Sequence, residues 1–474
     1  MSLFIRKPLD QLLAQTGDAA SGLKRTLGPL NLIALGIGAI IGAGLFVRTA
    51  SAAGGAAGPG VVFSYIIGGI GCAFAGLCYA EFASMIPIAG SAYAYAYVTM
   101  GEFIAWIIGW ALILEYALAS ATVAISWSQY LNSLLGGSIP FEWCHSPMEG
   151  GIVNVPAIFI LVLLTLVLIK GTQESATLNA IIVFIKVSIV LIFIAIGWSF
   201  INDANYDPFL IPADAVGHEA WNKHGFGGLL GGAAIVFFAF IGFDAVSTAA
   251  QEAKNPKRDM PIGILGSLVV CTILFVLFSH VLTGVANWKE LAGREASVAF
   301  AIKTYMPGYE WLATGITVAI LAGFSSVILV MLLGQSRVFF SMSKDGLVPK
   351  VFSEVHPKFR TPYKSNMILF AFVSLFAGFL PESVAGDLTS FGTLFAFVLV
   401  CAGIWVMRVT NPDVVRPFKT PLVPIVPILG IIICASLIYS LDNFTLKVAF
   451  SWMAFGLIVY FIYGKKHSLL RKQQ

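Results

Sequence analysis

Two apolar stretches of the chain are interrupted by glycine at corresponding positions. The pair Ile41-Gly42 in the first stretch and the pair Ile241-Gly242 in the second lie 200 residues apart. Unpaired backbone groups are costly in hydrocarbon, so a helix break there indicates a cavity or a bound group. Paired, interrupted segments in two halves of a chain are typical of a binding site at the membrane midplane. The stretches read LIALGIGAIIGAGLFVRTA and AAIVFFAFIGFDAVSTAA.

The backbone groups freed by these breaks suit a zwitterion. The N–H groups of Gly42, Ala43 and Gly44 are expected at the positive end of the following half-helix, which favours an anion. The half-helix before each break ends in unpaired carbonyls, which favour a cation such as an ammonium group. The alternative is that the glycines only allow close helix packing. That alternative is weaker for the pair, because the two breaks occupy corresponding positions.

Three ionisable residues fall deep inside apolar segments. Glu115 lies about 18 Å along its segment at 1.5 Å per residue, near the membrane midplane. Lys186 lies near the middle of another segment, and Asp244 follows the second break. Charged residues at this depth usually face the bundle interior and mark function. The alternative is a structural ion pair or, for Asp244, a cap on the next half-helix.

The elements that carry these residues are predicted to be membrane helices. The chain has 474 residues, of which 58% are hydrophobic and 11% charged, whereas a soluble domain has about 25% charged residues. A spanning helix needs about 20 apolar residues, and the sequence supplies twelve such segments. We therefore expect an all-α polytopic membrane protein with twelve transmembrane helices. The eighth segment, 298–340, is expected to form one long helix, and the alternating Tyr93, Tyr95 and Tyr97 are expected in a loop between helices. The predicted units are a tail 1–30, helices 1–5 in 31–201, helices 6–10 in 226–410, helices 11–12 in 422–463 and a tail 464–474.

The distribution of lysine and arginine predicts the orientation. With the N-terminus inside, 21 of these residues fall on the inner side and 6 on the outer side. Loops with excess positive charge stay in the cytoplasm, so both termini are expected there, in the inner (plasma) membrane. The net charge of +4 is then a topology signal rather than a nucleic-acid contact. The outer residues are Arg48, Lys223, Lys289, Arg294, Lys303 and Lys447.

The sequence lacks the motifs of several enzyme classes. It contains no phosphate-binding loop of the GxxxxGK[ST] type, no GxSxG nucleophile elbow and no HExxH zinc motif. The exterior histidines lack metal-ligand spacing, and five of the six cysteines fall in apolar segments. We expect no catalytic site, no metal, no cofactor and no disulfide framework.

Several motifs together resemble the bacterial cationic amino acid transporter family of the amino acid–polyamine–organocation superfamily. The likeness runs from about Gly28 to the end of the twelfth segment, and it implies two inverted five-helix repeats followed by two extra helices. The helices of segments 1 and 6 would be the broken ones. The motifs are GIGAIIGAGLFV, FFAFIGFDAVSTAAQEAKNPKRDMPIGI, GQSRVFFSMSKDGLVP, GSAYAYAY and FGTLFAF.

The resemblance also implies roles for individual residues. The substrate carboxylate would meet the backbone of Gly42, Ala43 and Gly44, and Glu115 matches a family glutamate. Lys186 would take the place of a sodium ion found in related carriers, with the hydroxyls of Ser325 and Ser326 as partners. One departure is Ala43, where the family often has a hydroxyl residue or glycine. The substrate amine would meet carbonyls near Ile40, Phe238, Ala239 and Ile241, with Phe238 as a gate. Glu115 and Asp244 are also expected to be substrate-binding residues.

The predicted function is a secondary active permease for cationic or small neutral amino acids. Alternating access coupled to protons is expected, because a lysine at the midplane loses hydration and can exchange a proton. The alternatives are a proton-independent amino acid exchanger and a transport-inactive amino acid sensor. The expected partners are the amino acid, protons and the lipid bilayer, with no nucleic acid. A small membrane-protein partner is left open.

Overall fold

The computed structural model describes residues 3–8, 27–86, 91–171, 176–294, 296–359 and 361–472. Most of the predicted tail 1–30 therefore lies outside the described residues. Helices account for most of these residues, and no strand occurs among them. Seven of the described helices are long and apolar enough to cross a membrane, and five shorter apolar helices accompany them. The chain is a polytopic, all-helical membrane protein, as the sequence predicts.

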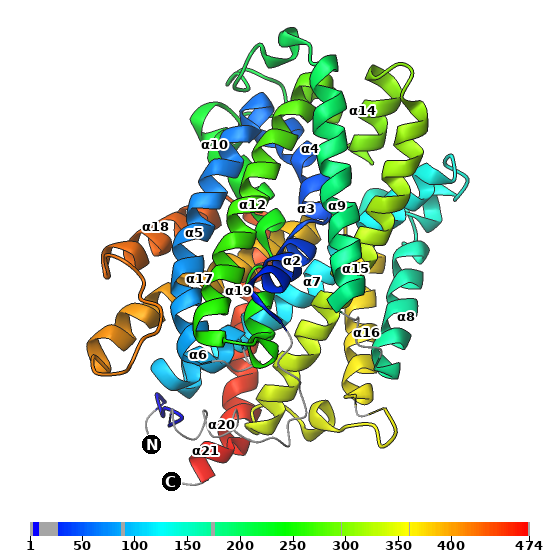
Figure 1. The fold of residues 1–474 in the computed structure, drawn as a ribbon. Helices are drawn as coiled ribbons and strands as arrows, with labels where there is room; N and C mark the ends of the chain where they lie inside the picture. Colours follow the sequence, from blue (N-terminus) through cyan, green and yellow to red (C-terminus); the bar gives the residue numbers. More distant parts are fainter. Residues whose placement is uncertain are drawn as a thin grey trace.

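The helices follow one another in the order of the predicted apolar segments (Figure 1). Those before residue 200 are α2 (Pro29–Ile40), α3 (Ala43–Phe46), α4 (Arg48–Ala52), α5 (Val61–Met85), α6 (Ser91–Thr99), α7 (Glu102–Leu134), α8 (Val155–Lys170) and α9 (Ala176–Gly197). Those that follow are α10 (Gly225–Val236), α11 (Ala245–Thr248), α12 (Pro256–Val285), α13 (Trp288–Leu291), α14 (Ser297–Tyr305), α15 (Glu310–Lys344), α16 (Tyr363–Phe379) and α17 (Glu382–Thr410). The last are α18 (Ile425–Tyr439), α19 (Asn443–Val459), α20 (Lys465–His467) and α21 (Leu469–Lys472).

Local sequence sets several helix ends. The Asn154 side chain accepts a hydrogen bond from the Ala157 N–H and caps the start of α8. Gly171 ends the same helix in the left-handed region, at φ 72°, where a side chain would be strained. Asp442 caps α19 by accepting from the Phe444 N–H. Short polar residues and glycine thus determine where these apolar helices begin and end.

The structure differs from two sequence expectations. The apolar segment 298–340 is predicted as one long helix, but a turn at Met306–Tyr309 separates α14 from α15. The period-two tyrosines Tyr93, Tyr95 and Tyr97 are expected in a loop, but they lie in α6 and are buried. Alternating alanine and tyrosine form a helix here because aromatic packing on several sides buries the rings.

Several helix–helix contacts have a counterpart in which each helix is replaced by the helix that begins 195–208 residues away in the chain. Helix α2 packs on α12, and correspondingly α10 packs on α5. Helix α7 packs on α17 as α15 packs on α9, and α7 packs on α16 as α15 packs on α8. The contact of α2 with α9 has its counterpart in that of α10 with α17. Helices whose first residues lie 195–208 residues apart therefore make matching sets of contacts.

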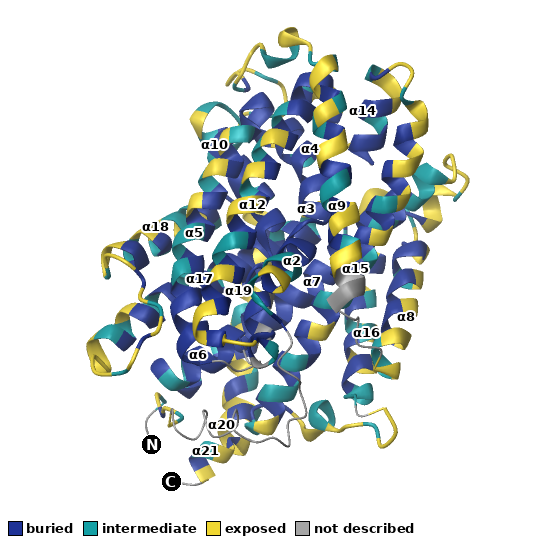
Figure 2. Cartoon of the chain, in the orientation of Figure 1, coloured by how far each residue is buried: buried dark blue, intermediate teal, exposed yellow. Residues whose placement is uncertain are grey.

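Burial is concentrated around α2, α3 and α7, and the outer helices expose apolar side chains (Figure 2). Helix α18 exposes Ile425, Ile432 and Tyr439, and α19 exposes Phe450 and Ile458. Exposed apolar faces on peripheral helices suit lipid as a solvent. Both chain ends lie at the same end of the molecule, beside α6, α20 and α21 (Figure 1).

Candidate functional site

The first break separates α2 from α3. Helix α2 ends at Ile40, Ile41 is extended, and α3 begins at Ala43. Among the described residues, the N–H groups of Gly42, Ala43 and Gly44 have no backbone acceptor. The Ile40 carbonyl likewise accepts no backbone N–H. The break therefore presents three donors and at least one acceptor from adjacent residues.

The second break lies between a short 3-10 helix, Phe237–Phe240, and α11. Gly242 has φ 113°, a conformation that side chains rarely adopt. The Ala239 carbonyl accepts no backbone hydrogen bond among the described residues. A 3-10 turn running into a glycine reversal leaves carbonyls unpaired at the end of the first half-helix.

The backbones of the two breaks are in direct contact. A Cβ built on Gly44 would lie 2.2 Å from the Ala239 Cα, and one built on Gly242 would lie 3.0 Å from the Ala39 carbonyl. Glycine is therefore required at Gly44 by close approach of another backbone. The contact brings the donors of one break beside the acceptors of the other.

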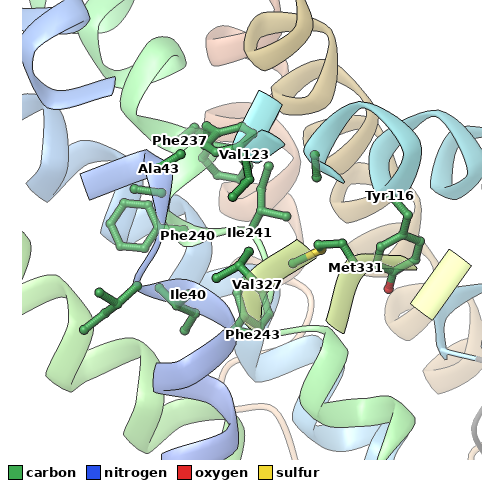
Figure 3. Packing of buried hydrophobic residues seen from close by; sticks show 14 of the residues in the cluster. Ile40, Ala43, Tyr116, Val123, Phe237, Phe240, Ile241, Phe243, Val327 and Met331 are labelled. Atoms are coloured by element: carbon green, nitrogen blue, oxygen red, sulfur yellow. The ribbon is translucent and has the colours of Figure 1, made fainter. Parts of the chain in front are cut away.

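A small cavity lies at this crossing and leaves room for about one water molecule. Ile241, Val123, Val327 and Met331 converge on it from three different elements (Figure 3). Apart from the backbone of the breaks, the lining is apolar. The lining residues are Ala39, Ile40, Gly42, Ala43, Gly44, Ala119, Val123, Phe238, Ile241, Val327 and Met331.

Six of the predicted site residues line this cavity, and they come from both breaks. They are Ile40, Gly42, Ala43, Gly44, Phe238 and Ile241. The predicted Ala239 does not line it but contacts Gly44 directly. The remaining predicted residues lie elsewhere in the core.

Glu115 lies on α7 one helical turn before Ala119, which lines the cavity. Its side chain is 1% exposed, and neither carboxylate oxygen has a hydrogen-bond partner among the described residues. Gly392 of α17 packs against it, because a Cβ there would lie 3.2 Å from the Glu115 Cβ. The four residues from Glu115 to Ala119 correspond to about 6 Å along the helix. The carboxylate is thus close to the cavity without lining it.

Asp244 stabilises the second break instead of lining the cavity. One carboxylate oxygen accepts from the Gly242 N–H at 3.3 Å, and the other accepts from the Tyr116 hydroxyl at 2.9 Å. In the part of the chain that the structure describes, its side chain makes no capping hydrogen bond to α11. Asp244 therefore links the break to α7, a contact that the sequence does not predict.

Lys186 connects α9 to the first half of segment 1. Its Nζ donates to the Gly38 carbonyl at 2.7 Å, and the side chain is 2% exposed. On α15, a Cβ built on Gly323 would lie 2.9 Å from the lysine Cε. The two predicted hydroxyl partners differ in their hydrogen bonds. Ser325 donates to the Leu321 carbonyl of its own helix, and Ser326 Oγ has no hydrogen-bond partner among the described residues.

This arrangement can bind a small zwitterion. Free N–H groups attract a carboxylate and free carbonyls attract an ammonium group. Within the described residues, no cluster of three or more histidine, cysteine or acidic side chains could hold a metal ion.

The family model described as amino acid permease matches residues 27–463. The chain belongs to the amino acid permease family. It resembles a branched-chain amino acid permease of Bacillus subtilis (strain 168), with 42% identity over 99% of both chains. A methylthioribose transporter of the same organism is 41% identical, over 99% of this chain and 100% of the relative. A vacuolar cationic amino acid transporter of Arabidopsis thaliana is 34% identical, over 87% and 68% respectively.

The permease is therefore a transporter of amino acids and not an enzyme. The match covers both breaks and all twelve predicted apolar segments. These relatives are named for different cargoes, so the family membership leaves the preferred substrate open.

Sequence reasoning missed a buried ion cluster on the permease. Arg48 is counted with the outer-side charges, yet it is 1% exposed. Its guanidinium lies 3.5 Å from Glu382 and also bonds to Asp387, both on α17. Gly386 leaves room for it, because a Cβ there would lie 3.0 Å from the Arg48 Cζ. Arg48 is thus a buried partner of α17 and not a solvated loop charge.

Sequence reasoning also missed the side-chain lining of the cavity on α7 and α15. Ala119 and Val123 follow Glu115 at intervals of four residues, and Val327 and Met331 follow Gly323 in the same way. Residues four apart share one helix face. Helical spacing counted from Glu115 could have identified Ala119 and Val123. No sequence signal indicates Val327 and Met331, because the sequence alone does not show that Gly323 contacts Lys186.

Proposed function

We propose that this permease is a secondary active transporter of zwitterionic amino acids with aliphatic side chains. The observation that supports it is the apolar lining around the free backbone groups of the two breaks. Backbone donors and acceptors would hold the groups common to all amino acids. Ala119, Val123, Val327 and Met331 would then surround the side chain, and apolar surface binds aliphatic groups best.

The bound amino acid would have a defined orientation. Its carboxylate would accept from the N–H groups of Gly42, Ala43 and Gly44, and its ammonium group would donate to the carbonyls of Ile40 and Ala239. Phe238 would cover the site as a gate. The cavity has to widen for any amino acid, so binding involves movement of the elements around the breaks.

A second candidate substrate class is the cationic amino acids. Glu115 supports it, because its buried carboxylate has no hydrogen-bond partner among the described residues and lies one turn from Ala119. A buried, uncompensated carboxylate is costly. A long cationic side chain extending about 6 Å from the cavity would supply the missing partner.

The architecture would be a five-plus-five inverted repeat of twelve helices. The exchange symmetry of the helix contacts supports it, with the unit from α2 to α9 matching the unit from α10 to α17 and with α18 and α19 added. Alternating access would then arise from the movement of one group of helices against the other. Lysines and arginines favour an inner, cytoplasmic membrane location with both termini in the cytoplasm.

Proton coupling would centre on Lys186. The hydrogen bond to the Gly38 carbonyl and the contact with Gly323 support it, since together they join α9, α2 and α15. A protonated lysine would hold α2 against α15 and favour the state that accepts substrate from outside. Loss of the proton toward the cytoplasm would weaken this link and favour release. Sodium would then be unnecessary.

The deciding experiment is uptake by the purified protein in proteoliposomes. We expect radiolabelled leucine or valine to accumulate under an inward proton gradient, with sodium replacement without effect. Arginine and methylthioribose would serve as competitors, and strong inhibition by arginine would favour the cationic class. Uptake that requires internal amino acid and ignores the gradient would identify an exchanger. Binding without any flux would identify a sensor and overturn the proposal.

A further inference from the structure

The two chain ends meet at a buried carboxylate. Glu102, the first residue of α7, is 0% exposed and accepts four side-chain hydrogen bonds. The Arg471 Nε donates at 2.6 Å, and the hydroxyls of Tyr97 and Tyr460 each donate at 3.0 Å. The Ser468 hydroxyl also donates to it. Arg471 is 6% exposed in this ion pair, so the C-terminal segment is inserted rather than solvated.

A second carboxylate joins the chain ends to α15. Asp345 follows the last residue of that helix, and its carboxylate accepts from the Lys7 Nζ and the Tyr93 hydroxyl, each at 2.8 Å. Its carbonyl accepts from the Leu469 N–H at 3.0 Å. One residue thus binds both the N-terminal and the C-terminal segment.

The N-terminal segment completes the arrangement through its backbone. The Ile5 carbonyl accepts from the Glu102 N–H at 2.9 Å, and the Lys7 N–H donates to the Tyr97 carbonyl at 3.2 Å. The Leu3 carbonyl accepts from Arg471 at 3.4 Å. We call this set of contacts the terminal clasp: segments 3–7 and 468–471 with Glu102 and Asp345.

The terminal clasp lies across the two halves of the molecule. Glu102 belongs to α7 and Asp345 to the end of α15, which are equivalent helices of the two halves. It also holds α6, whose Ser91 hydroxyl accepts from the Ser247 hydroxyl of α11 at 3.4 Å. Helix α11 follows the second break directly. The clasp therefore lies at the end of the molecule that carries both termini, beside α6, α20 and α21 (Figure 1).

We propose that the terminal clasp is a latch that keeps the terminus side closed and has to release before substrate can leave there. This inference rests on the proposed alternating access. Separation of α6 and α7 from α15 breaks either the contacts at Glu102 or those at Asp345. Because both sets are buried and charged, the closed state gains from them and the open state does not. The termini therefore set how often the permease opens to that side.

The test measures access to Ser247 from the terminus side. In a variant without the six native cysteines, Ser247→Cys is labelled by an impermeant maleimide in vesicles that expose this side. We expect Arg471→Gln to label about 10-fold faster than the parent, the change that a charged hydrogen bond supports. Lys472→Gln is the matched control, because it removes the same charge from the adjacent, exposed residue. Arg471→Lys should restore most of the parent rate.

Parent-like labelling of a folded Arg471→Gln variant would overturn the latch, as would equal acceleration by Lys472→Gln. Gel filtration and thermal unfolding establish whether the variant is folded. Should Arg471→Gln not fold, Lys7→Gln at the second carboxylate is judged by the same rates. Labelling requires no transported substrate. If the parent showed no amino acid uptake, the proposed function would be contradicted, but the labelling rates would still test the latch.

Discussion

Replacing Gly44 with alanine is the most direct perturbation of the crossing between the two breaks. The added methyl would lie 2.2 Å from the Ala239 Cα and 2.7 Å from its N atom, both of which belong to the backbone. Backbone cannot rotate away as a side chain can, so the breaks must separate. Overpacking of this kind costs about 1–3 kcal/mol. We expect substrate affinity to fall by about 5-fold to 150-fold, because one factor of ten corresponds to about 1.4 kcal/mol.

Two other glycines provide graded controls for this prediction. A Cβ on Gly42 would lie 3.1 Å from a methyl of Val327, which can rotate, and one on Gly55 would meet nothing within 4 Å. The order of affinity loss should therefore be Gly44→Ala, then Gly42→Ala, then Gly55→Ala. Equilibrium binding of labelled leucine and arginine to purified protein measures it, with thermal unfolding as the check on folding.

The result that would refute the reasoning is parent-like binding by Gly44→Ala. A loss equal to that of Gly55→Ala would be equally contrary, since it would mean that close approach of the breaks is irrelevant. A lower unfolding temperature for Gly44→Ala with unchanged affinity would mean that the contact between Gly44 and Ala239 contributes to stability but not to binding. Each outcome can be read separately, because binding and unfolding are measured on the same preparation.

The remaining predictions concern coupling, selectivity and topology. Lys186→Met should abolish uphill accumulation under a proton gradient but retain exchange. Gly323→Ala should weaken accumulation, because its methyl group would lie 2.9 Å from the Lys186 Cε. Counterflow assays with and without the gradient measure both variants. Glu115→Gln should reduce arginine binding more than leucine binding, by about tenfold for a lost charged contact, and equal losses would indicate a structural role. Cys144 should resist impermeant thiol reagents because it is 4% exposed, whereas Trp143→Cys, at a position 46% exposed, should react only from outside intact cells.

The sequence predicts the fold well because the bilayer limits what apolar segments can form. Apolar runs of sufficient length become helices whatever their detailed composition. The two breaks were found because glycine and a 200-residue offset mark them in the letters alone. The error at residues 298–340 arose because α14 is apolar without spanning the membrane by itself.

The residues that the sequence did not reveal owe their roles to long-range contacts. Arg48 reads as an outer-side charge, since its partners on α17 lie more than 330 residues away. Glu102 reads as an ordinary acidic residue at a helix start, yet it binds the far end of the chain. Met331 and Val327 are apolar residues on an apolar helix. Hydropathy cannot distinguish such positions from residues that face lipid.

Helix α4, which begins with Arg48, and helices α20 and α21 beside the terminal clasp lie toward opposite ends of the molecule (Figure 1). We therefore expect opposite effects when the Arg48 ion pair and the clasp are broken. Both are formed while the cavity has room for about one water molecule and the residues that line it are buried, as expected for a state closed toward both sides. Apparent affinity falls in proportion to the fraction of molecules open to the side where substrate is added. Breaking a buried ion pair costs about 3–5 kcal/mol, and here the cost falls on the closed state.

Arg48→Gln should therefore tighten apparent binding of substrate added from the outer side and weaken it from the terminus side. Arg471→Gln should do the reverse, with Lys472→Gln as the common reference. Right-side-out and inside-out vesicles prepared from the same cells provide the comparison. Loss of affinity from both sides in either variant would contradict a population shift, because an altered distribution between two open states has to favour one side at the expense of the other.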